Sequence, residues 1–217
     1  VRKLTTTING DTINGDGGDN FLWGGGGADT INGGAGNDTL HGKNKSYSGA
    51  GDSNQDDSAN NVLNGDAGND TLVTGDGADT LDGGTGADSI TTGSGADTII
   101  IRIGDGGSTL ATADTITDFI DGTDVISLDG SLTYSNLTIA QGTGSNSSDT
   151  IISAGSEYLA ILTGISASNI NYYDFTTTAT GNQNFTGTTD DDVFIGASGV
   201  DTATTGTGTD VVLGWLG

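Results

Sequence analysis

The feature that most constrains this chain is a nine-residue period in its first half. Asp or Asn recurs at every ninth position, with one interruption, and Ile or Leu follows each of them two residues later. The Asp and Asn positions are Asp11, Asn20, Asp29, Asp38, Asn61, Asp70, Asp79, Asp88 and Asp97. The apolar partners are Ile13, Leu22, Ile31, Leu40, Leu63, Leu72, Leu81, Ile90 and Ile99. A short unit repeated this often predicts a solenoid, because one unit cannot bury its apolar residue alone whereas a stack of units can.

Glycine-rich turns separate the apolar residues, as in the sequence GGAGND that ends at Asp38. Each unit therefore divides into six residues of turn and three of strand, and two units make one coil of eighteen residues. The turns then fall alternately on two edges, and the apolar side chains stack inward about 4.8 Å apart. We expect an all-β fold in which residues 1–103 form a parallel β-solenoid.

The acidic residues are almost all Asp. The chain has 28 Asp and one Glu, 40 Gly, no Pro, Cys or Met, and a formal net charge of −24. Glu favours helices and Asp favours turns, so this skew places the carboxylates on the turns. The charge argues against a nucleic-acid partner, and no apolar run is long enough to span a membrane. The chain begins at Val1 without Met, so we expect a processed product or a fragment.

Turns of this kind have the chemistry of a calcium site. Calcium takes about six to eight oxygen ligands, and a glycine-rich turn can direct its carbonyls inward while the final Asp adds a carboxylate. One turn supplies half of such a shell, and the turn one coil away on the same edge supplies the rest. Besides the nine Asp and Asn positions, the candidate ligands are first and third residues of the turns: Gly15, Gly17, Gly24, Gly26, Gly33, Ala35, Gly65, Ala67, Thr74, Asp76, Gly83, Thr85, Thr92 and Ser94.

Pairs of turns predict five calcium sites, and a sixth bridges the interruption. The five pairs are Asp11/Asp29, Asn20/Asp38, Asn61/Asp79, Asp70/Asp88 and Asp79/Asp97, and the sixth is Asp38/Asn61. Asn20 and Asn61 lack a charge, so we expect weaker sites there. Asp82 ends a strand outside the ligand position, so its replacement by Ala should slightly favour calcium binding by relieving repulsion.

The interruption between Asp38 and Asn61 spans two units plus five residues. We interpret 42–61 as an irregular coil with a short turn at 42–45, a strand at 46–48 and an enlarged turn from 49 to 61. One edge would then carry Asn20, Asp38, Asn61, Asp79 and Asp97. The short turn has Lys43 and Lys45 in place of a ligand, so no ion is expected between Asp29 and Asp70 on the other edge.

The rhythm changes after the first half. Residues 104–175 contain longer alternating segments, which predict a β-rich cap that closes the last coil. Residues 176–217 indicate a linker and the start of a second, imperfect array, in which the nine-residue spacing resumes at Asp192, Asp201 and Asp210. Asp192 and Asp210 are therefore further candidate ligands.

Residues 8–103 resemble the calcium-binding β-roll of the RTX (repeats-in-toxin) family of secreted bacterial proteins, on the repeated motif G-G-x-G-x-D-x-U-x. Residues 98–175 resemble the segment after the roll in serralysin-type metalloproteases, on D-x-I-x-D-F at 114–119 and G-x-D-x-I at 122–126. The resemblance implies a right-handed parallel β-roll, which is a calcium-stabilised β-solenoid, followed by a β-rich cap. It also implies type I secretion, with the chain unfolded in the low-calcium cytoplasm.

The same resemblance implies a further calcium site at Asp114 and Asp124, helped by Asp118. The alternative is that these three residues are ordinary polar residues at strand ends. Both interpretations are compatible with the sequence.

Catalytic motifs are missing from the sequence, which has neither H-E-x-x-H nor G-x-S-x-G and a single histidine, His41. We expect His41 and Trp23 to be structural. The leading hypothesis is a non-catalytic structural or adhesive module of a secreted or cell-surface bacterial protein: a surface layer, an extracellular filament or an adhesin spacer. Its partners would be calcium and copies of itself or other cell-surface components. The alternative is the C-terminal secretion and folding module of an RTX protease or lipase. Ice binding would need ranks of Thr at the third turn position, where Thr85 stands alone.

Overall fold

The computed structural model describes residues 3–4, 9–43 and 58–177, together with four short strands between residues 184 and 213. The described residues form strands, turns and four single-turn 3-10 helices, η1(Leu110–Thr112), η2(Tyr134–Asn136), η3(Gly144–Asn146) and η4(Tyr172–Asp174). No helix in this part of the chain is long and apolar enough to cross a membrane. The prediction of an all-β fold is confirmed.

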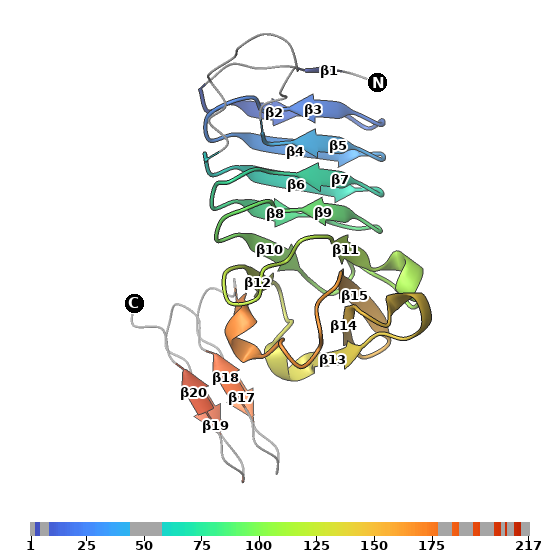
Figure 1. The fold of residues 1–217 in the computed structure, drawn as a ribbon, viewed down its shortest axis with the longest axis vertical. Helices are drawn as coiled ribbons and strands as arrows, with labels where there is room; N and C mark the ends of the chain where they lie inside the picture. Colours follow the sequence, from blue (N-terminus) through green and yellow to red (C-terminus); the bar gives the residue numbers. More distant parts are fainter. Residues whose placement is uncertain are drawn as a thin grey trace.

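Two facing sheets of short strands make the roll, and each coil adds one strand to each sheet (Figure 1). Sheet A runs β1(Lys3–Leu4), β3(Phe21–Trp23), β5(Thr39–His41), β7(Thr71–Val73), β9(Ser89–Thr91), β11(Asp114–Ile116), β15(Glu157–Leu162), β14(Thr150–Ala154), β13(Leu137–Gln141). Sheet B runs β2(Thr12–Asn14), β4(Thr30–Ala35), β6(Val62–Ala67), β8(Thr80–Asp82), β10(Thr98–Ile101), β12(Val125–Leu128), β16(Phe175–Thr177). From β1 to β12 every pairing is parallel, as a β-roll requires.

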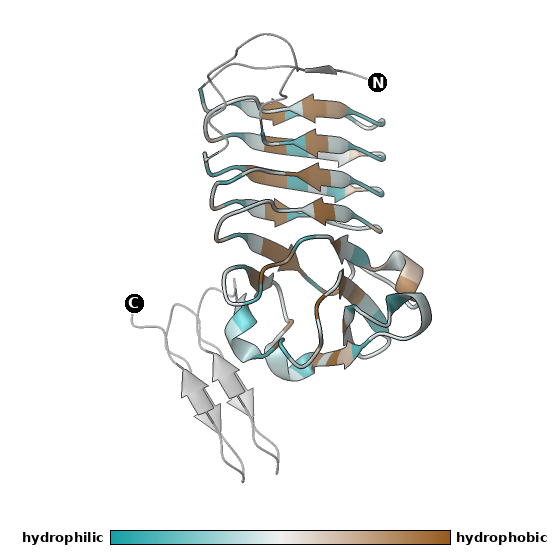
Figure 2. Cartoon of the chain, in the orientation of Figure 1, coloured by the Kyte–Doolittle hydropathy of each residue, from teal (hydrophilic) through white to brown (hydrophobic). Residues whose placement is uncertain are grey.

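The predicted apolar residues form the core of the roll. All nine belong to one buried cluster, and none is more than 2% exposed. Figure 2 shows hydrophobic residues along the strands of the roll. Their neighbours along each strand point outward, because successive side chains of a strand alternate between its two faces. On the outer face of sheet B, Asn14, Asn32 and Asn64 form a ladder: each later Nδ2 donates to the preceding Oδ1, at 2.6 and 2.7 Å.

The strands on either side of the interruption pair directly with each other. Thr30 of β4 pairs with Val62 of β6, and Thr39 of β5 pairs with Thr71 of β7, so no coil lies between them. The predicted strand at 46–48 falls outside the described residues, and the extra half coil that it required is wrong. Lengthening one turn adds little closure entropy, whereas a half coil without a glycine-rich turn would lose its ladder contacts.

This register redefines the two edges. Edge 1 joins sheet B strands to the following sheet A strands, and its turns end at Asn20, Asp38, Asp70, Asp88 and Asp114. Edge 2 joins sheet A strands to sheet B strands, and its turns end at Asp11, Asp29, Asn61, Asp79, Asp97 and Asp124. The predicted neighbours Asp38 and Asn61 therefore lie on opposite edges. Across the enlarged turn the neighbours are Asp29 with Asn61 and Asp38 with Asp70, so the expected gap between Asp29 and Asp70 is also wrong.

The cap continues both sheets and then closes them. Strands β11 and β12 pair in parallel with β9 and β10, whereas β15, β14 and β13 form an antiparallel meander beyond β11. Most of its buried apolar side chains join the core of the roll in one cluster, including Phe119, Leu132, Ile152, Leu159 and Phe175. Ala113, Ile151 and Ile161 form a second, smaller cluster. The cap therefore buries the end of the last coil, as predicted for this segment.

The last segment contains two parallel strand pairs. Strand β17(Asn184–Thr186) pairs with β19(Thr202–Thr204), and β18(Val193–Ile195) pairs with β20(Val211–Leu213). Both registers join residues eighteen positions apart, which is the coil length of the first array. Asp192 and Asp210 lie outside the described residues, so their ligand role stays a prediction.

Candidate metal centres

One kind of hydrogen bond links successive turns on both edges. The side chain of the last turn residue accepts, through Oδ1, the backbone N–H of the equivalent residue one coil earlier, at 2.6–3.1 Å. We call these two rows the carboxylate ladders. The acceptors are Asp38, Asp70, Asp88 and Asp114 on edge 1, and Asp29, Asn61, Asp79, Asp97 and Asp124 on edge 2. The structure thus brings the predicted Asp and Asn residues into two columns.

The second oxygen of most ladder carboxylates is buried without a hydrogen-bond donor. Within the described residues this holds for Oδ2 of Asp29, Asp38, Asp70, Asp88, Asp97 and Asp114. Each of these residues is at most 2% exposed. Burying a carboxylate oxygen without a donor is unfavourable unless a cation or a proton compensates the charge. A column of such oxygens, repeated from coil to coil, fits a column of cations.

Backbone atoms bound the space around these oxygens. On edge 1, a Cβ added to Gly33 would lie 2.5 Å from Oδ2 of Asp38 and 2.7 Å from the carbonyl oxygen of Gly65, one coil further on. A Cβ on Gly65 would likewise overlap with Oδ2 of Asp70 and the carbonyl of Gly83. The first carbonyl of one turn therefore faces the carboxylate of the turn before it. This convergence matches the predicted half shells, and glycine leaves the gap open.

The third turn residues have a second role. The N–H of Gly36 donates to the carbonyl of Ala67 at 2.8 Å, and the N–H of Gly68 donates to the carbonyl of Thr85 at 3.0 Å. Each of these carbonyls keeps one further lone pair that could face a cation. Ligand roles for the third turn residues stay predictions. No three His, Cys, Asp or Glu side chains converge in the described residues, and the turns instead combine carboxylates with carbonyls.

The two Asn positions are satisfied by protein groups. Oδ1 of Asn20 accepts the N–H of Asp16 at 3.1 Å. Oδ1 of Asn61 accepts the N–H of Asp29 at 2.9 Å, and its Nδ2 donates to the carbonyl of Ala59 at 3.1 Å. These amides have less need of a cation than the carboxylates, which supports the expectation of weaker sites.

Near the cap, edge 2 has features that the sequence did not suggest. Thr74 and Thr92 occupy first turn positions and are fully buried. The Thr74 hydroxyl donates to the carbonyl of Thr92 at 2.6 Å. Asp118 accepts the N–H groups of Thr92 and Gly93, both at 2.9 Å. Asp118 therefore binds the end of the roll through backbone N–H groups.

The two carboxylates predicted in the cap differ from each other. Asp124 has both oxygens occupied, since Oδ1 accepts the N–H of Asp97 at 3.1 Å and Oδ2 the N–H of Ile120 at 2.7 Å. Asp114 accepts only the N–H of Asp88 at 3.0 Å, through Oδ1, and its buried Oδ2 has no donor. Of the two, Asp114 therefore fits the metal role better.

Burial makes the ladder carboxylates reluctant to ionise without a cation. It raises the pKa of Asp29 to about 6, against the opposing backbone hydrogen bond from Asp11. Burial raises the pKa of Asp70 to about 7, aided by repulsion from the carboxylates of Asp88 and Asp38. It also raises the pKa of Asp114 to about 9, with repulsion from Asp88 as the next cause. A divalent cation would reverse these shifts by favouring the charged form.

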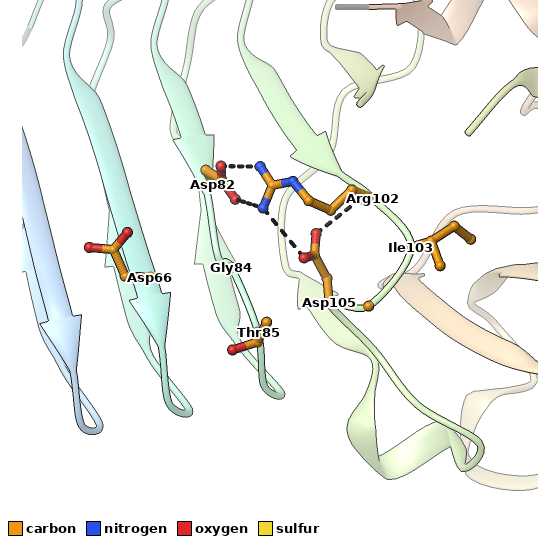
Figure 3. Close-up of a pocket in the computed structure, with 8 residues that line it drawn as sticks. Asp66, Asp82, Gly84, Thr85, Arg102, Ile103 and Asp105 are labelled. Atoms are coloured by element: carbon orange, nitrogen blue, oxygen red, sulfur yellow. Dashed lines mark hydrogen bonds and ion pairs between the residues drawn. The ribbon is translucent and has the colours of Figure 1, made fainter. Parts of the chain in front are cut away.

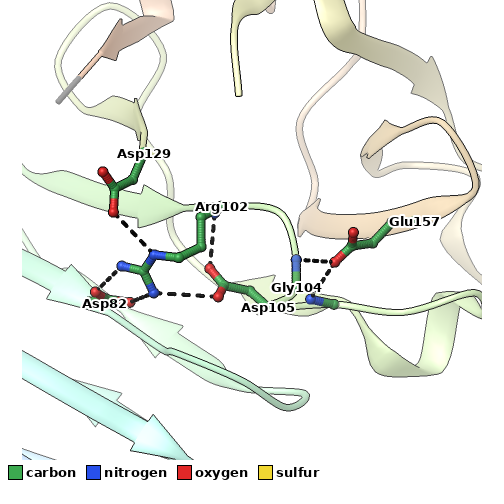
Figure 4. Close-up of polar contacts among 7 residues, drawn as sticks. Asp82, Arg102, Gly104, Asp105, Asp129 and Glu157 are labelled. Carbon is green, nitrogen blue, oxygen red and sulfur yellow. Dashed lines mark hydrogen bonds and ion pairs between the residues drawn. The ribbon is translucent and has the colours of Figure 1, made fainter. Parts of the chain in front are cut away.

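Asp82 has a partner that sequence reasoning missed. The guanidinium of Arg102 forms a bidentate ion pair with Asp82, and also contacts Asp105 and Asp129 (Figure 4). The expectation that Asp82 only adds repulsion is therefore not supported. Arg102 follows a predicted strand, and nothing in the local pattern shows that its side chain reaches back one coil.

His41 and Trp23 lie in an aromatic cluster on the outer face of sheet A. The rings of Trp23 and His41 stack with centroids 5.2 Å apart, and Phe21 meets Trp23 edge-on at 4.6 Å. These contacts join neighbouring coils and support the structural role expected for both residues.

Comparison with protein families identifies the repeats. The model of the RTX calcium-binding nonapeptide repeat matches in four copies, at residues 5–40, 55–90, 73–107 and 177–217, which together cover more than half of the chain. These nonapeptide repeats bind Ca²⁺. No curated protein matches the chain.

Several solved structures are similar to this chain. The extracellular lipase LipA from Serratia marcescens has 18% identity and a TM-score of 0.42, over 80% of this chain and 39% of the lipase. The AlgE6R2 subunit of the mannuronan C5-epimerase from Azotobacter vinelandii has 22% identity and a TM-score of 0.44, over 77% of this chain and 92% of the subunit. The AlgE6R3 subunit of that enzyme has 23% identity and a TM-score of 0.24, over 79% and 80%. The chain thus spans about two fifths of the lipase.

Proposed function

The chain belongs to the family of RTX calcium-binding nonapeptide repeat proteins, and from this premise we propose that it is a non-catalytic module that folds when calcium binds outside the cell. The observation that carries the proposal is the column of buried Oδ2 atoms without donors on each edge. These oxygens make the folded roll unfavourable without a cation and favourable with one. Calcium affinity thereby becomes folding energy.

The residues of the roll divide the work between them. The stacked Ile and Leu side chains supply the core, but one buried apolar residue in nine does not offset the entropy of ordering nine backbone residues. The Oδ1 hydrogen bonds set the register of the coils. Glycines such as Gly33 and Gly65 leave room where carboxylate and carbonyl oxygens converge. Bound calcium would neutralise the facing carboxylates and complete the link between coils.

The cellular role follows from this dependence on calcium. A chain with net charge −24 and few large apolar side chains should stay unfolded where calcium is scarce. We infer that the module is exported unfolded from a bacterium and becomes a rigid rod in a calcium-rich medium. As part of a surface layer, a filament or an adhesin, it would act as a structural spacer. A folding module attached to an enzyme would use the same physics, and the sequence of the parent protein separates the two.

Circular dichroism during a calcium titration tests the proposal. In excess chelator most of the roll should lack β structure, and it should gain it cooperatively at about 10⁻⁴–10⁻³ M calcium, the range of extracellular sites. Magnesium is the control, because it demands near-ideal octahedral geometry and should not replace calcium at equal concentration. A chelated protein with the full β spectrum would contradict the proposal.

A further inference from the structure

The last turn of edge 1 and the strand β8 beside it depart from the repeat in three places. We call residues 102–107 the closing turn; it leads from β10 toward the cap. Asp105 stands where earlier turns have Ala67 or Thr85, because its carbonyl accepts the N–H of Gly86 just as the carbonyl of Thr85 accepts that of Gly68. Arg102 opens the turn in place of a glycine-rich start. Asp82 continues the outer rank of Asn14, Asn32 and Asn64 with a charge.

These three departures contact one another. Nη1 of Arg102 donates to Oδ1 of Asp82 at 3.1 Å, and Nη2 contacts Oδ2 of the same carboxylate. The backbone N–H of Arg102 donates to Oδ2 of Asp105 at 2.9 Å, and Nη1 lies 3.4 Å from its Oδ1. The Nε atom donates to Oδ2 of Asp129 at 3.2 Å. One side chain therefore links β8, the closing turn and the residue after β12 (Figure 4).

The carboxylates of this cluster contact a cationic side chain, whereas most ladder carboxylates have a buried Oδ2 without a donor. Asp105 is 3% exposed, as deeply buried as the ladder residues, yet Arg102 contacts both of its oxygens. The hydrogen bond to Asp82 raises the pKa of Arg102, so the guanidinium keeps its charge at any physiological pH. Charge-assisted bidentate pairs are among the stronger polar contacts in proteins.

The cap holds the other side of the same turn. Oε1 of Glu157, the one Glu in the chain, accepts the N–H of Gly104 at 2.8 Å and of Gly106 at 3.2 Å. Strand β15 also exchanges backbone hydrogen bonds with the turn, between Gly107 and Tyr158, at 2.8 and 3.3 Å. The closing turn is thus fixed by the roll through Arg102 and by the cap through Glu157.

We propose that Arg102 is a built-in cation that holds the last roll coil to the cap without calcium. Its single positive charge contacts Asp82, Asp105 and Asp129 and offsets part of their mutual repulsion, a task that elsewhere in the roll falls to a metal ion. Strands β8, β10 and β12 and the cap should therefore keep their structure at calcium concentrations too low for β2 to β7. The expectation that β2 to β7 lose their structure at low calcium rests on the proposed function, whereas the expectation for β8, β10, β12 and the cap does not.

Hydrogen exchange of the whole chain, followed by mass spectrometry in chelator and in calcium, tests the proposal. In chelator, amides of β10 and β12 should be protected, and Arg102→Gln should speed their exchange by at least about tenfold, since exchange rates report local opening. In excess calcium the two proteins should differ by less than about threefold in these strands. Equal exchange of β10 and β12 in chelator for both proteins would overturn the proposal.

Two further variants serve as a matched control and as a second test of the proposal. Asp66→Asn is the matched control: Asp66 lines the same cleft as Arg102, but its Oδ2 accepts the N–H of Gly34 at 3.2 Å, and its replacement should leave β10 and β12 unchanged (Figure 3). If Arg102→Gln fails to fold even in calcium, Asp129→Asn removes only the most exposed contact and should speed exchange about threefold. No change in Asp129→Asn would then overturn the proposal. Full protection of β4 and β6 in chelator would instead contradict the proposed function, and the proposal about Arg102 would still stand.

Discussion

The roll and the cap solve the same packing problem with different means. In the roll, one apolar residue in nine is buried, and many of the carboxylates at the ends of the described turns keep a buried oxygen without a donor. In the cap, apolar residues cluster from several strands, and the buried carboxylates other than Asp114 have protein partners for their oxygens. Asp149, for example, accepts the N–H of Gly164 at 2.9 Å and the side chain of Asn146 at 3.0 Å. The difference teaches that the roll leaves part of its bonding to a ligand, whereas most of the cap is complete by itself.

Removing one ladder carboxylate should separate the two regions most strongly. Asp70→Ala deletes an Oδ1 that accepts the N–H of Asp38 and a buried Oδ2 that is a candidate calcium ligand, so we expect the calcium midpoint to rise about tenfold or more. Asp149→Ala should lower the melting temperature with and without calcium and move the midpoint by less than about twofold. Circular dichroism measures the calcium midpoint during titrations and the melting temperature during heating. Similar midpoint shifts would mean that calcium screens a diffuse acidic surface.

Filling one glycine gap should have the next largest effect. In Gly65→Ala, the new methyl group would overlap with Oδ2 of Asp70 and the carbonyl of Gly83, so we expect a midpoint several-fold higher and a lower melting temperature in calcium. Gly17→Ala is the control, since a Cβ there meets nothing within 4 Å. If both variants behave alike, the gap at Gly65 does not shape a calcium site.

Acid should affect the ladder carboxylates of the roll and Asp149 of the cap in opposite directions. Burial raises the pKa of Asp29 and Asp97 to about 6 and of Asp70 to about 7 in the folded roll, whereas unfolded Asp titrates near about 3.9. Between these values the calcium-free folded roll binds more protons than the unfolded chain, so its stability should rise as pH falls from about 7 to 4. The hydrogen bond from Gly164 lowers the pKa of Asp149 in the folded cap. The stability that ionised Asp149 contributes is therefore fully present above the pKa of unfolded Asp, and it is lost as the pH falls below that value.

Circular dichroism in chelator at several pH values measures this contrast, because a roll that is unfolded at neutral pH should gain β structure as the ladder carboxylates take up protons. The calcium concentration needed for folding should fall over the same range, because bound protons neutralise carboxylates that calcium would otherwise neutralise. A chelated protein whose β content does not rise on mild acidification would contradict the assignment of raised pKa values to the ladders.

The smallest expected effect is at Asp82. Asp82→Asn weakens the ion pair with Arg102, but Arg102 still contacts Asp105 and Asp129. We therefore expect the calcium midpoint to rise by less than about threefold. Asp76→Asn is the matched control: this side chain is exposed on an edge 2 turn, and removing its charge should lower the midpoint slightly. A lower midpoint in Asp82→Asn as well would show that Asp82 only contributes repulsion.

Much of the fold and of the candidate site could be predicted from the sequence. The nine-residue period placed Ile31 and Leu72 inside the roll and the carboxylates of Asp38 and Asp70 on the turns, because a repeat of this length has a single way to bury its apolar residue. The repeat also indicated calcium, since glycine-rich turns that end in Asp offer hard oxygen ligands. These features are local, and a local pattern is sufficient to specify them.

Tertiary structure decided what the period leaves open. A local repeat cannot distinguish an extra half coil from one enlarged turn, and only the pairing of β4 with β6 and of β5 with β7 assigned Asn61 to the column of Asp29. The partners of Asp82 and Thr92 were also out of reach, because Arg102 and Asp118 approach them from positions 20 and 26 residues away. Pairing and packing between coils stabilise one register, and long side chains then contact residues of neighbouring coils. Which turn faces which, and which charge meets which, is therefore settled only when the coils assemble.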